Sequence, residues 1–332
     1  MALGEFDLIA RHFTRPVRRS PLGVGDDCAL IAPAAGMQLA VSSDMLVEGR
    51  HFLSTVAPER LGHKALAVNL SDLAACGARP LAYTLALSLP RADEAWLAAL
   101  ASGLHALADR HDIELVGGDT TAGPLNLCIT VFGEVPAGDA LLRSGARAGD
   151  DLWISHPATP DEPGWLGEAR LMLEIFRGTP GVRTEGIDLD RLRLAMECPQ
   201  PRVALGLALR GVARSAIDVS DGLLGDLGHV LRRSGGLGAR IEAAALPRSA
   251  AILRQHEALQ LECLLAGGDD YELLFSADPT DRDTVSALAA RAGCGVTRIG
   301  TLGAAGTPLE VVDADGRPLA TAWASFDHFL SR

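Results

Sequence analysis

The sequence predicts a mixed α/β architecture of the α+β type, divided into two domains. Its 332 residues are about twice the length of a common single domain. A hydrophobic content of 48% with 36 glycines is typical of a compact enzyme rather than of a disordered chain. Helical and strand-like segments follow one another in both halves without strict alternation, which favours two α+β domains over a barrel.

The first predicted domain comprises residues 1–137. We expect helices where apolar residues recur every three or four positions, and strands where they run together. A glycine turn at 23–27 leads into a short strand, and Pro90 ends a longer one. The predicted helices are 4–13, 61–76 and 93–111, and the other predicted strands are 38–43, 81–89, 114–116 and 125–135.

Residues 136–151 change in character, with Gly, Arg and Asp and little periodicity, and we place the domain boundary there. The second predicted domain comprises residues 150–332, and its proline-containing stretch 156–164 is expected to be a loop. The predicted helices are 166–176, 189–196, 202–214, 223–233 and 281–292, and the predicted strands are 152–155, 216–219, 239–243, 272–276, 296–302 and 309–312.

The predicted helix at 61–76 carries apolar residues around most of its circumference, so we expect it to be largely buried. Asp72 lies on the same stripe as Val68, and a carboxylate among apolar neighbours is costly unless it is paired or bound to metal. Lys64, the only lysine of the chain, lies within about one-third of a turn of Asp72. Two interpretations stay open: a buried ion pair with Lys64, or a ligand that faces a metal site.

The formal net charge of −12 and the lack of a basic run argue against nucleic-acid binding and anionic-membrane binding. The six cysteines form no CxxC pair, so the sequence indicates neither a zinc site nor a disulfide framework. Reduced thiols fit a cytoplasmic location best. We find no signal-type apolar run near the N-terminus and no stretch of the ~20 apolar residues that a membrane span needs.

Acidic residues beside glycine recur where strands are predicted to end. These residues are Asp26, Asp27, Asp44, Asp119, Asp218, Asp221, Asp269 and Asp270. Each alone has a simple explanation, because Asp and Gly form turns and Asp221 suits the cap of the next helix. Together with Asp72 they predict a carboxylate cluster. Each pair would repel by about 4 kcal/mol at ~4 Å and an effective dielectric of ~20, and Mg²⁺, Mn²⁺ or Ca²⁺ would remove that cost.

The common phosphate-binding motifs GxxxxGK[ST] and GxGxxG are both missing from the sequence. If the chain handles polyphosphate, metal ions must carry the charge, helped by glycine-loop amides and a few arginines. Arg143 is a candidate phosphate contact, and a solvated linker arginine is the alternative explanation.

A set of longer motifs resembles the thiamine-monophosphate kinases, of the superfamily that includes aminoimidazole ribonucleotide synthetase and selenophosphate synthetase. The resemblance extends over almost the whole chain, and its motifs and their order are highly specific. The motifs begin at Gly4, Gly25, Ser42, Ala67, Gly117, Arg143, Ala216, Gly267 and Trp323. The Gly4-Glu5-Phe6 start, the segment around His51 and the C-terminal aromatic residues favour the kinases over the other members.

The resemblance implies ATP-dependent phosphorylation of thiamine monophosphate to thiamine diphosphate with several Mg²⁺ ions, in a homodimer built on the N-terminal sheets. It implies a cleft between the domains as the site. The implied metal ligands are Asp27, Ser42, Ser43, Asp44, Asp72, Asp119, Asp218 and Asp221. The implied ATP contacts are Gly118, Asp119, Arg143 and Ser220, and the implied substrate contacts are His51, Asp269 and Phe326.

The acceptor would be a phosphate oxygen that is already anionic near neutral pH, so we expect direct in-line transfer and no catalytic general base. The sequence departs from the family pattern at three places. Ser43 replaces a threonine, Asp269 replaces a glutamate, and residues 156–164 replace a glycine/alanine-rich segment. Two rival hypotheses are another ATP-using superfamily member that activates an amide or selenide, and a metal-binding or structural protein without turnover.

Overall fold

The computed structural model describes residues 5–319, which form two compact units. The first unit extends to Leu73 and resumes at Ala78–Gly138, and the second combines Ala74–Gly77 with the chain from Asp139 onward. The sequence analysis placed the first domain at residues 1–137 and the second at 150–332. Among the described helices, none is both long enough and apolar enough to cross a membrane.

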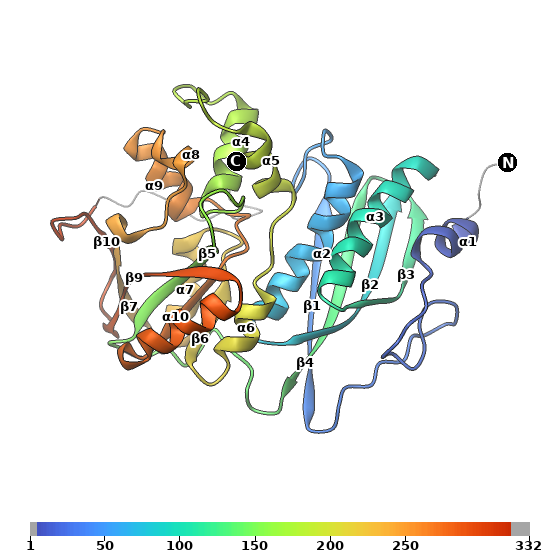
Figure 1. The fold of residues 1–332 in the computed structure, drawn as a ribbon, viewed down its shortest axis with the longest axis horizontal. Helices are drawn as coiled ribbons and strands as arrows, with labels where there is room; N and C mark the ends of the chain where they lie inside the picture. The colour runs from blue at the N-terminus through green and yellow to red at the C-terminus, as the bar shows by residue number, and fades with distance from the viewer. Residues whose placement is uncertain (1–4, 320–332) are drawn as a thin grey trace. The chain divides into compact units, whose positions relative to one another are not determined.

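A four-stranded mixed sheet with the order β1-β4-β2-β3 organises the first unit (Figure 1). The strands are β1 (Met37–Val47), β2 (Arg79–Leu89), β3 (Glu114–Ala122) and β4 (Asn126–Pro136). β4 pairs antiparallel with both β1 and β2, whereas β2 and β3 are parallel. β1 and β3 are therefore the edge strands of the sheet.

Two long helices, α2 (Pro58–Ala75) and α3 (Glu94–Arg110), lie over one face of this sheet (Figure 1). A Cβ at Gly62 would come within 2.1 Å of the Leu100 carbonyl oxygen, and one at Gly103 within 1.8 Å of the Glu59 oxygen. Only glycine permits this close approach of the two helices. Leu85 and Leu87 of β2 are buried under the helices, while Ala86 between them is exposed on the opposite, uncovered face.

The chain enters the first unit through α1 (Glu5–Leu8) and a π-helical turn, η1 (Ile9–Phe13), and then runs without a regular strand to β1. The predicted strand after the glycine turn is wrong, because this stretch makes only isolated bridges such as Leu22 with Leu30. The side chain of Glu114 accepts the backbone N–H groups of Arg18, Arg19 and Ser20 at 2.6, 3.1 and 3.1 Å.

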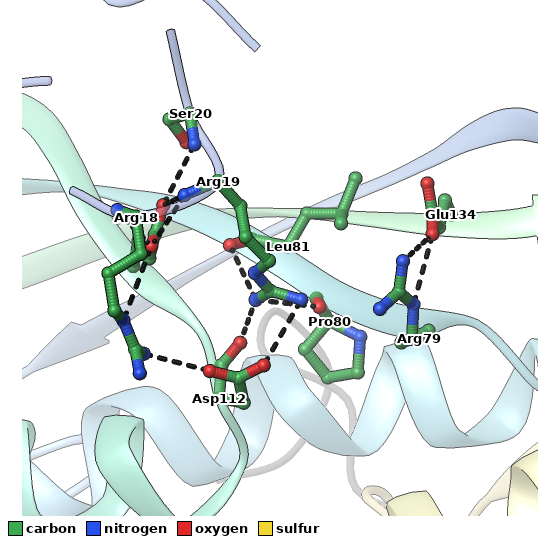
Figure 2. Close-up of polar contacts among 9 residues, drawn as sticks. Arg18, Arg19, Ser20, Arg79, Pro80, Leu81, Asp112 and Glu134 are labelled. Atoms are coloured by element: carbon green, nitrogen blue, oxygen red, sulfur yellow. Dashed lines mark hydrogen bonds and ion pairs between the residues drawn. The ribbon is translucent and has the colours of Figure 1, made fainter. Parts of the chain in front are cut away.

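Arginine side chains add further contacts between the entering segment, β2 and β4 (Figure 2). The Arg19 guanidinium reaches both the carboxylate and the carbonyl oxygen of Asp112, and Arg79 pairs with the buried Glu134. Glu134 also accepts the backbone N–H of Ala34 at 3.0 Å. The irregular segment that carries Asp27 is thus fixed at both of its ends.

The second unit contains a six-stranded sheet with the order β10-β7-β9-β5-β8-β6, in which only β10 and β7 are parallel neighbours. Its strands are β5 (Asp151–Pro157), β6 (Ala213–Asp218), β7 (Leu237–Glu242), β8 (Leu273–Ala277), β9 (Cys294–Ala305) and β10 (Leu309–Val312). Its helices are α4 (Glu168–Arg177), α5 (Leu189–Glu197), α6 (Val203–Leu209), α7 (Leu223–Arg233), α8 (Ala250–Leu253), α9 (Glu257–Ala266) and α10 (Arg282–Arg291), with short 3₁₀ turns η2 (Ala243–Ala245) and η3 (Pro279–Asp281).

The structure corrects several predicted element bounds. β1 and β3 continue well past their predicted ends, so Asp44 and Asp119 lie inside strands rather than at strand ends. The predicted helix at 202–214 ends after α6, and its last residues begin β6. α8 and α9 were not predicted.

We predict that Glu114→Gln lowers the free energy of unfolding at pH 7 by about 1.5–3 kcal/mol, since it weakens charge-assisted hydrogen bonds to three amides. Burial raises the pKa of the Glu114 carboxyl, but the three N–H donors outweigh it and hold that pKa below its usual range. The stabilisation is therefore present above a pH of about 4.3 and is lost as the pH falls through the lower folded pKa.

Urea unfolding of both proteins at several pH values tests this prediction. The difference in unfolding free energy should narrow from pH 7 toward about pH 3. A difference that stays constant over this range would show that the charge of Glu114 does not carry the effect.

Candidate active site

Two polar contacts join the centre of β1 to the buried helix α2. The Ser42 hydroxyl donates to a carboxylate oxygen of Asp72 at 2.5 Å, and the backbone N–H of Asp44 donates to the Asn69 side-chain oxygen at 3.0 Å. Asn69 is fully buried and donates in turn to the Ala65 carbonyl oxygen. Ser42, Asp44 and Asp72 are therefore brought together on the helix-covered side of the sheet.

Ser43 and Asp119 lie on the other side of the same sheet. The side chains of consecutive strand residues alternate between faces, and the Ser43 hydroxyl contacts Thr130 at 2.9 Å, away from Asp72. Asp119 pairs in register with Ala86, whose side chain is on the uncovered face. A Cβ at Gly118 would lie 1.9 Å from the Leu85 carbonyl oxygen, so only glycine fits the close approach of β2 at this position.

Asp27 and His51 occupy two separate loops of the first unit. Asp27 is exposed, and its N–H donates to the side chain of Asp26 at 2.9 Å. His51 closes a tight turn after β1, where its Nδ1 accepts the backbone N–H of Val47 at 3.0 Å. Because Nδ1 is the acceptor, the hydrogen of the neutral imidazole is on Nε2.

In the second unit, the turn from β6 to α7 carries Asp218, Ser220 and Asp221. Asp218 is buried at the last position of β6, and Gly222 begins the helix at a φ of 117°. A carboxylate oxygen of Asp226, one turn into α7, accepts the N–H groups of Ser220, Asp221 and Gly222 at 3.1, 3.1 and 3.2 Å. Burial and the nearby charge of Asp221 raise the pKa of Asp226 to about 7, against the effect of these donors.

The loop between α9 and β8 is hydrogen-bonded to this turn. The N–H of Asp269 donates to the Ser220 carbonyl oxygen at 2.8 Å, and the N–H of Tyr271 donates to the Val219 oxygen at 2.8 Å. Asp269 and Tyr271 have φ values of 72° and 54°, an uncommon conformation for residues other than glycine. The structure thus joins Asp269, a predicted substrate residue, to the predicted metal-binding turn.

The residue between them, Asp270, points inward. Its carboxyl accepts the N–H of Gly167 at 2.8 Å, and its other oxygen has no hydrogen-bond partner. Burial raises the pKa of Asp270 well above its usual range. The neighbouring Glu272 is also buried but is paired with Arg202, which donates to it at 2.8 Å. Asp270 and Glu272 are therefore internal anchors of the loop that presents Asp269.

Arg143 lies in an extended loop that follows the outer side of β6. The preceding Leu142 accepts the N–H of Ala216 at 2.9 Å, and the Arg143 carbonyl oxygen accepts the Ser234 hydroxyl at 3.3 Å. Burial is the largest cause of the lowered pKa of His229 in α7. The charge of Arg143 also lowers this pKa, whereas the charge of Asp221 raises it. Arg143 is exposed, as expected for a ligand contact or a solvated arginine.

Among residues 5–319, no three His, Cys, Asp or Glu side chains gather closely enough to hold a metal ion. Oxygen donors are instead found in small sets, with Ser42 beside Asp72 in one unit and Asp218 near Asp221 in the other. Mg²⁺ is commonly bound by one or two carboxylates together with water and substrate phosphates. The donor chemistry of both sets fits Mg²⁺.

Comparison with known proteins identifies the family. The N-terminal and C-terminal domain models of AIR synthase related proteins match residues 25–135 and 179–311. The thiamine-monophosphate kinase of Salmonella typhimurium is 45% identical over 336 residues, with 100% of both chains covered. The chain belongs to the thiamine-monophosphate kinase family. The predicted family, enzyme class and two-domain mixed α/β fold are thereby confirmed.

Solved structures agree with this thiamine-monophosphate kinase assignment. The crystal structure of the enzyme from Stenotrophomonas maltophilia K279a matches with a TM-score of 0.81 and 45% identity, covering 94% of this chain and 95% of that one. AaThiL complexed with AMPPCP and TMP matches with a TM-score of 0.74 and 26% identity, covering 90% and 89%.

Two features of the site were not predicted from the sequence. Asn69 could have been noticed as an amide on a buried helix, three residues before Asp72. Asp226 gave no comparable signal, because an acidic residue in the first turn of a helix is common. Phe326, a predicted substrate contact, and Trp323 lie outside the described residues.

We predict that Gly268→Ala destabilises the protein by about 1–3 kcal/mol, the usual cost of overpacking. Its Cβ would lie 2.4 Å from the Ser220 carbonyl oxygen, so the loop of Asp269 and the turn of Asp221 must separate. Urea unfolding measures the loss of stability.

Gly228→Ala is the matched control. Its Cβ would contact only the end of the flexible Arg232 side chain, at 3.3 Å, on helix α7. We expect it to be neutral or to stabilise by about 0.5–1 kcal/mol. Equal effects of the two substitutions would contradict the close packing of the loop on the turn.

Proposed function

We propose that this chain transfers the γ-phosphoryl group of ATP to thiamine monophosphate, giving thiamine diphosphate and ADP. The observation that carries the proposal is full-length identity of 45% with thiamine-monophosphate kinases. AaThiL, at 26% identity, has been solved with AMPPCP and TMP, which supports binding of a nucleotide together with the acceptor. The six cysteines, all present as thiols, support a cytoplasmic location.

The proposed roles follow the chemistry of each residue. Carboxylates and hydroxyls bind the metal ions. The amide of Gly118, the guanidinium of Arg143 and the hydroxyl of Ser220 contact ATP. His51 can donate from Nε2 to the acceptor phosphate, since its Nδ1 already accepts from Val47. The proposed metal ligands are Asp27, Ser42, Asp44, Asp72, Asp119, Asp218 and Asp221, and Ser43 would take part through its carbonyl oxygen because its hydroxyl faces Thr130. Asp269 and Phe326 remain the other proposed substrate contacts.

Transfer needs positioning rather than a general base. The attacking oxygen of thiamine monophosphate is already anionic near pH 7, so the protein has to bring two anions into line. Mg²⁺ held by the proposed ligands, among them Asp72 and Asp221, would supply positive charge that offsets the charge of the phosphates. The residues of the chain hold the two phosphate groups in position, with His51 on the acceptor and Arg143 on the nucleotide. We propose a single in-line step without a phosphoenzyme.

We also propose a homodimer that is formed through the uncovered face of the four-stranded sheet. Apolar side chains follow one another on this face of the edge strand β1, and all are well exposed: Leu39, Val41, Met45 and Val47. Such a row on a sheet edge favours association. A second copy of the chain fits best, because the residues beside the row (Ser43, Thr130) are uncharged and do not call for a charged partner.

We predict that Val41→Lys makes the protein monomeric, because it places a charge in the middle of the apolar row. Val41 is 58% exposed in the single chain, so the folded monomer tolerates lysine there. Light scattering after gel filtration measures the mass. Leu253→Lys, at an exposed apolar position of α8, is the control and should remain dimeric. A dimeric Val41→Lys protein would contradict this interface.

The proposed function predicts that Asp72→Asn abolishes turnover while the fold persists. Asparagine keeps an oxygen that accepts from Ser42, but it removes the charge that a metal ion needs. Purified protein is incubated with ATP, Mg²⁺ and thiamine monophosphate, and thiamine diphosphate and ADP are measured. We expect a loss of at least about 100-fold. Circular dichroism checks the fold.

Asp109→Asn, which removes an exposed charge paired with Arg15 in the same unit, is the control and should keep full activity. Near-normal activity of Asp72→Asn would overturn the site assignment. ATP turnover without thiamine diphosphate would favour another member of the superfamily. Retention of configuration at a chiral γ-phosphate would exclude the single in-line step, because one such step inverts it.

A further inference from the structure

Asp226 is the buried carboxylate that completes the turn between β6 and α7. It is 3% exposed, and one of its oxygens, Oδ2, receives the N–H groups of three consecutive residues. The N–H groups of Ser220 and Asp221 lie before α7, and that of Gly222 is at its N-cap. Consecutive N–H groups of such a turn can bind an anion, and Asp226 fills that position from within the protein.

We propose that Asp226 is a positioning residue that makes this turn selective for metal-bound nucleotide. By occupying the amides of 220–222, it prevents direct phosphate binding there and fixes the direction of the Asp218 and Asp221 side chains. This inference rests on the proposed function, in which Asp218 and Asp221 bind metal ions and Ser220 contacts ATP. Asp226 itself touches neither nucleotide nor metal.

The physical reason lies in the polarity of the turn. Consecutive backbone N–H groups at a helix start attract phosphate, because they carry partial positive charge and point in one direction. A carboxyl oxygen that accepts all three N–H groups removes this preference, because the donors are no longer available to a phosphate. The turn then presents its own carboxylates to a cation. A nucleotide reaches it only through the metal.

The opposite side of the turn is equally fixed. The Ser220 carbonyl oxygen accepts the N–H of Asp269, and the N–H of Ser220 donates to Asp226. Both main-chain polar groups of Ser220 are thus engaged within the protein, which leaves its hydroxyl for the nucleotide. A Cβ at Gly222 would lie 3.0 Å from the Ala266 carbonyl carbon, so the turn has little room to shift toward α9.

Asp226→Ala provides the test, because the proposal predicts two effects of opposite sign. Binding of Mn²⁺, followed by its EPR signal in the presence of ADP, should weaken by about tenfold or more, as for other residues that orient metal ligands. Binding of ADP in EDTA, followed by calorimetry, should become tighter, because three amides are released for phosphate. General damage to the turn would weaken both, and that result would overturn the proposal.

Two variants and one wild-type measurement complete the design. Asp226→Asn keeps an acceptor oxygen without the charge, so it should show a smaller loss of Mn²⁺ affinity and a smaller gain of ADP affinity. It replaces the alanine variant if that variant does not fold. Asp188→Asn removes a carboxylate that caps α5 in the same unit, and it should change neither affinity. In the wild-type protein, amide hydrogen exchange at 220–222 should be slow without ligand, and fast exchange there would contradict the proposal.

The outcomes also separate this inference from the proposed function. If Asp221→Asn loses Mn²⁺ while the Asp226 variants bind Mn²⁺ and ADP as the wild type does, the positioning role is wrong and the metal site stands. If Asp221→Asn binds Mn²⁺ normally, or the wild type makes no thiamine diphosphate, the proposed function itself fails.

Discussion

Buried carboxylates that accept main-chain N–H groups hold the irregular segments of this protein in place. Several such carboxylates each fix a stretch of backbone that has no strand or helix partner. They include Glu114 for residues 18–20, Glu134 for Ala34, Asp226 for 220–222, Glu168 for 164–165 and Asp270 for Gly167. A buried N–H without a partner costs about 1–3 kcal/mol. At Glu114 the three donors outweigh burial and lower the pKa, whereas at Asp226 burial prevails and raises the pKa to about 7. In both cases the accepted N–H groups order the loop.

Arginine completes this pattern in a chain that has a single lysine. Asp151, almost fully buried, lies between Arg282 and Arg298, and Arg202 binds Glu272 through two nitrogens. The planar guanidinium matches both oxygens of a carboxylate, which a lysine ammonium cannot do. Part of the acidic composition is therefore paired in the interior and not available for ligands. The net charge alone does not say which part.

The sequence predicted what depends on local pattern. Apolar periodicity located α2, α3 and α7 to within a few residues, and the resemblance identified the family. The sequence did not predict the length of β1 and β3. Their polar and glycine residues resemble the ends of strands, yet their backbone continues to pair with neighbouring strands. The face on which Asp44 and Asp119 lie depends on that pairing, so their positions on opposite sides of the sheet were beyond local pattern.

The role of Asp226 could not be predicted from local sequence pattern, for a related reason. In the sequence, Asp226 is a third acidic residue near the predicted helix start that Asp218 and Asp221 precede, and nothing local distinguishes its role. The structure separates them by their hydrogen bonds, since Asp226 accepts three amides on one oxygen while Asp221 donates its own N–H to Asp226. A carboxylate oxygen that is filled by N–H donors has little left for a cation. Counting the amides that each carboxylate receives therefore distinguishes anchors, such as Glu114 and Asp226, from candidate ligands.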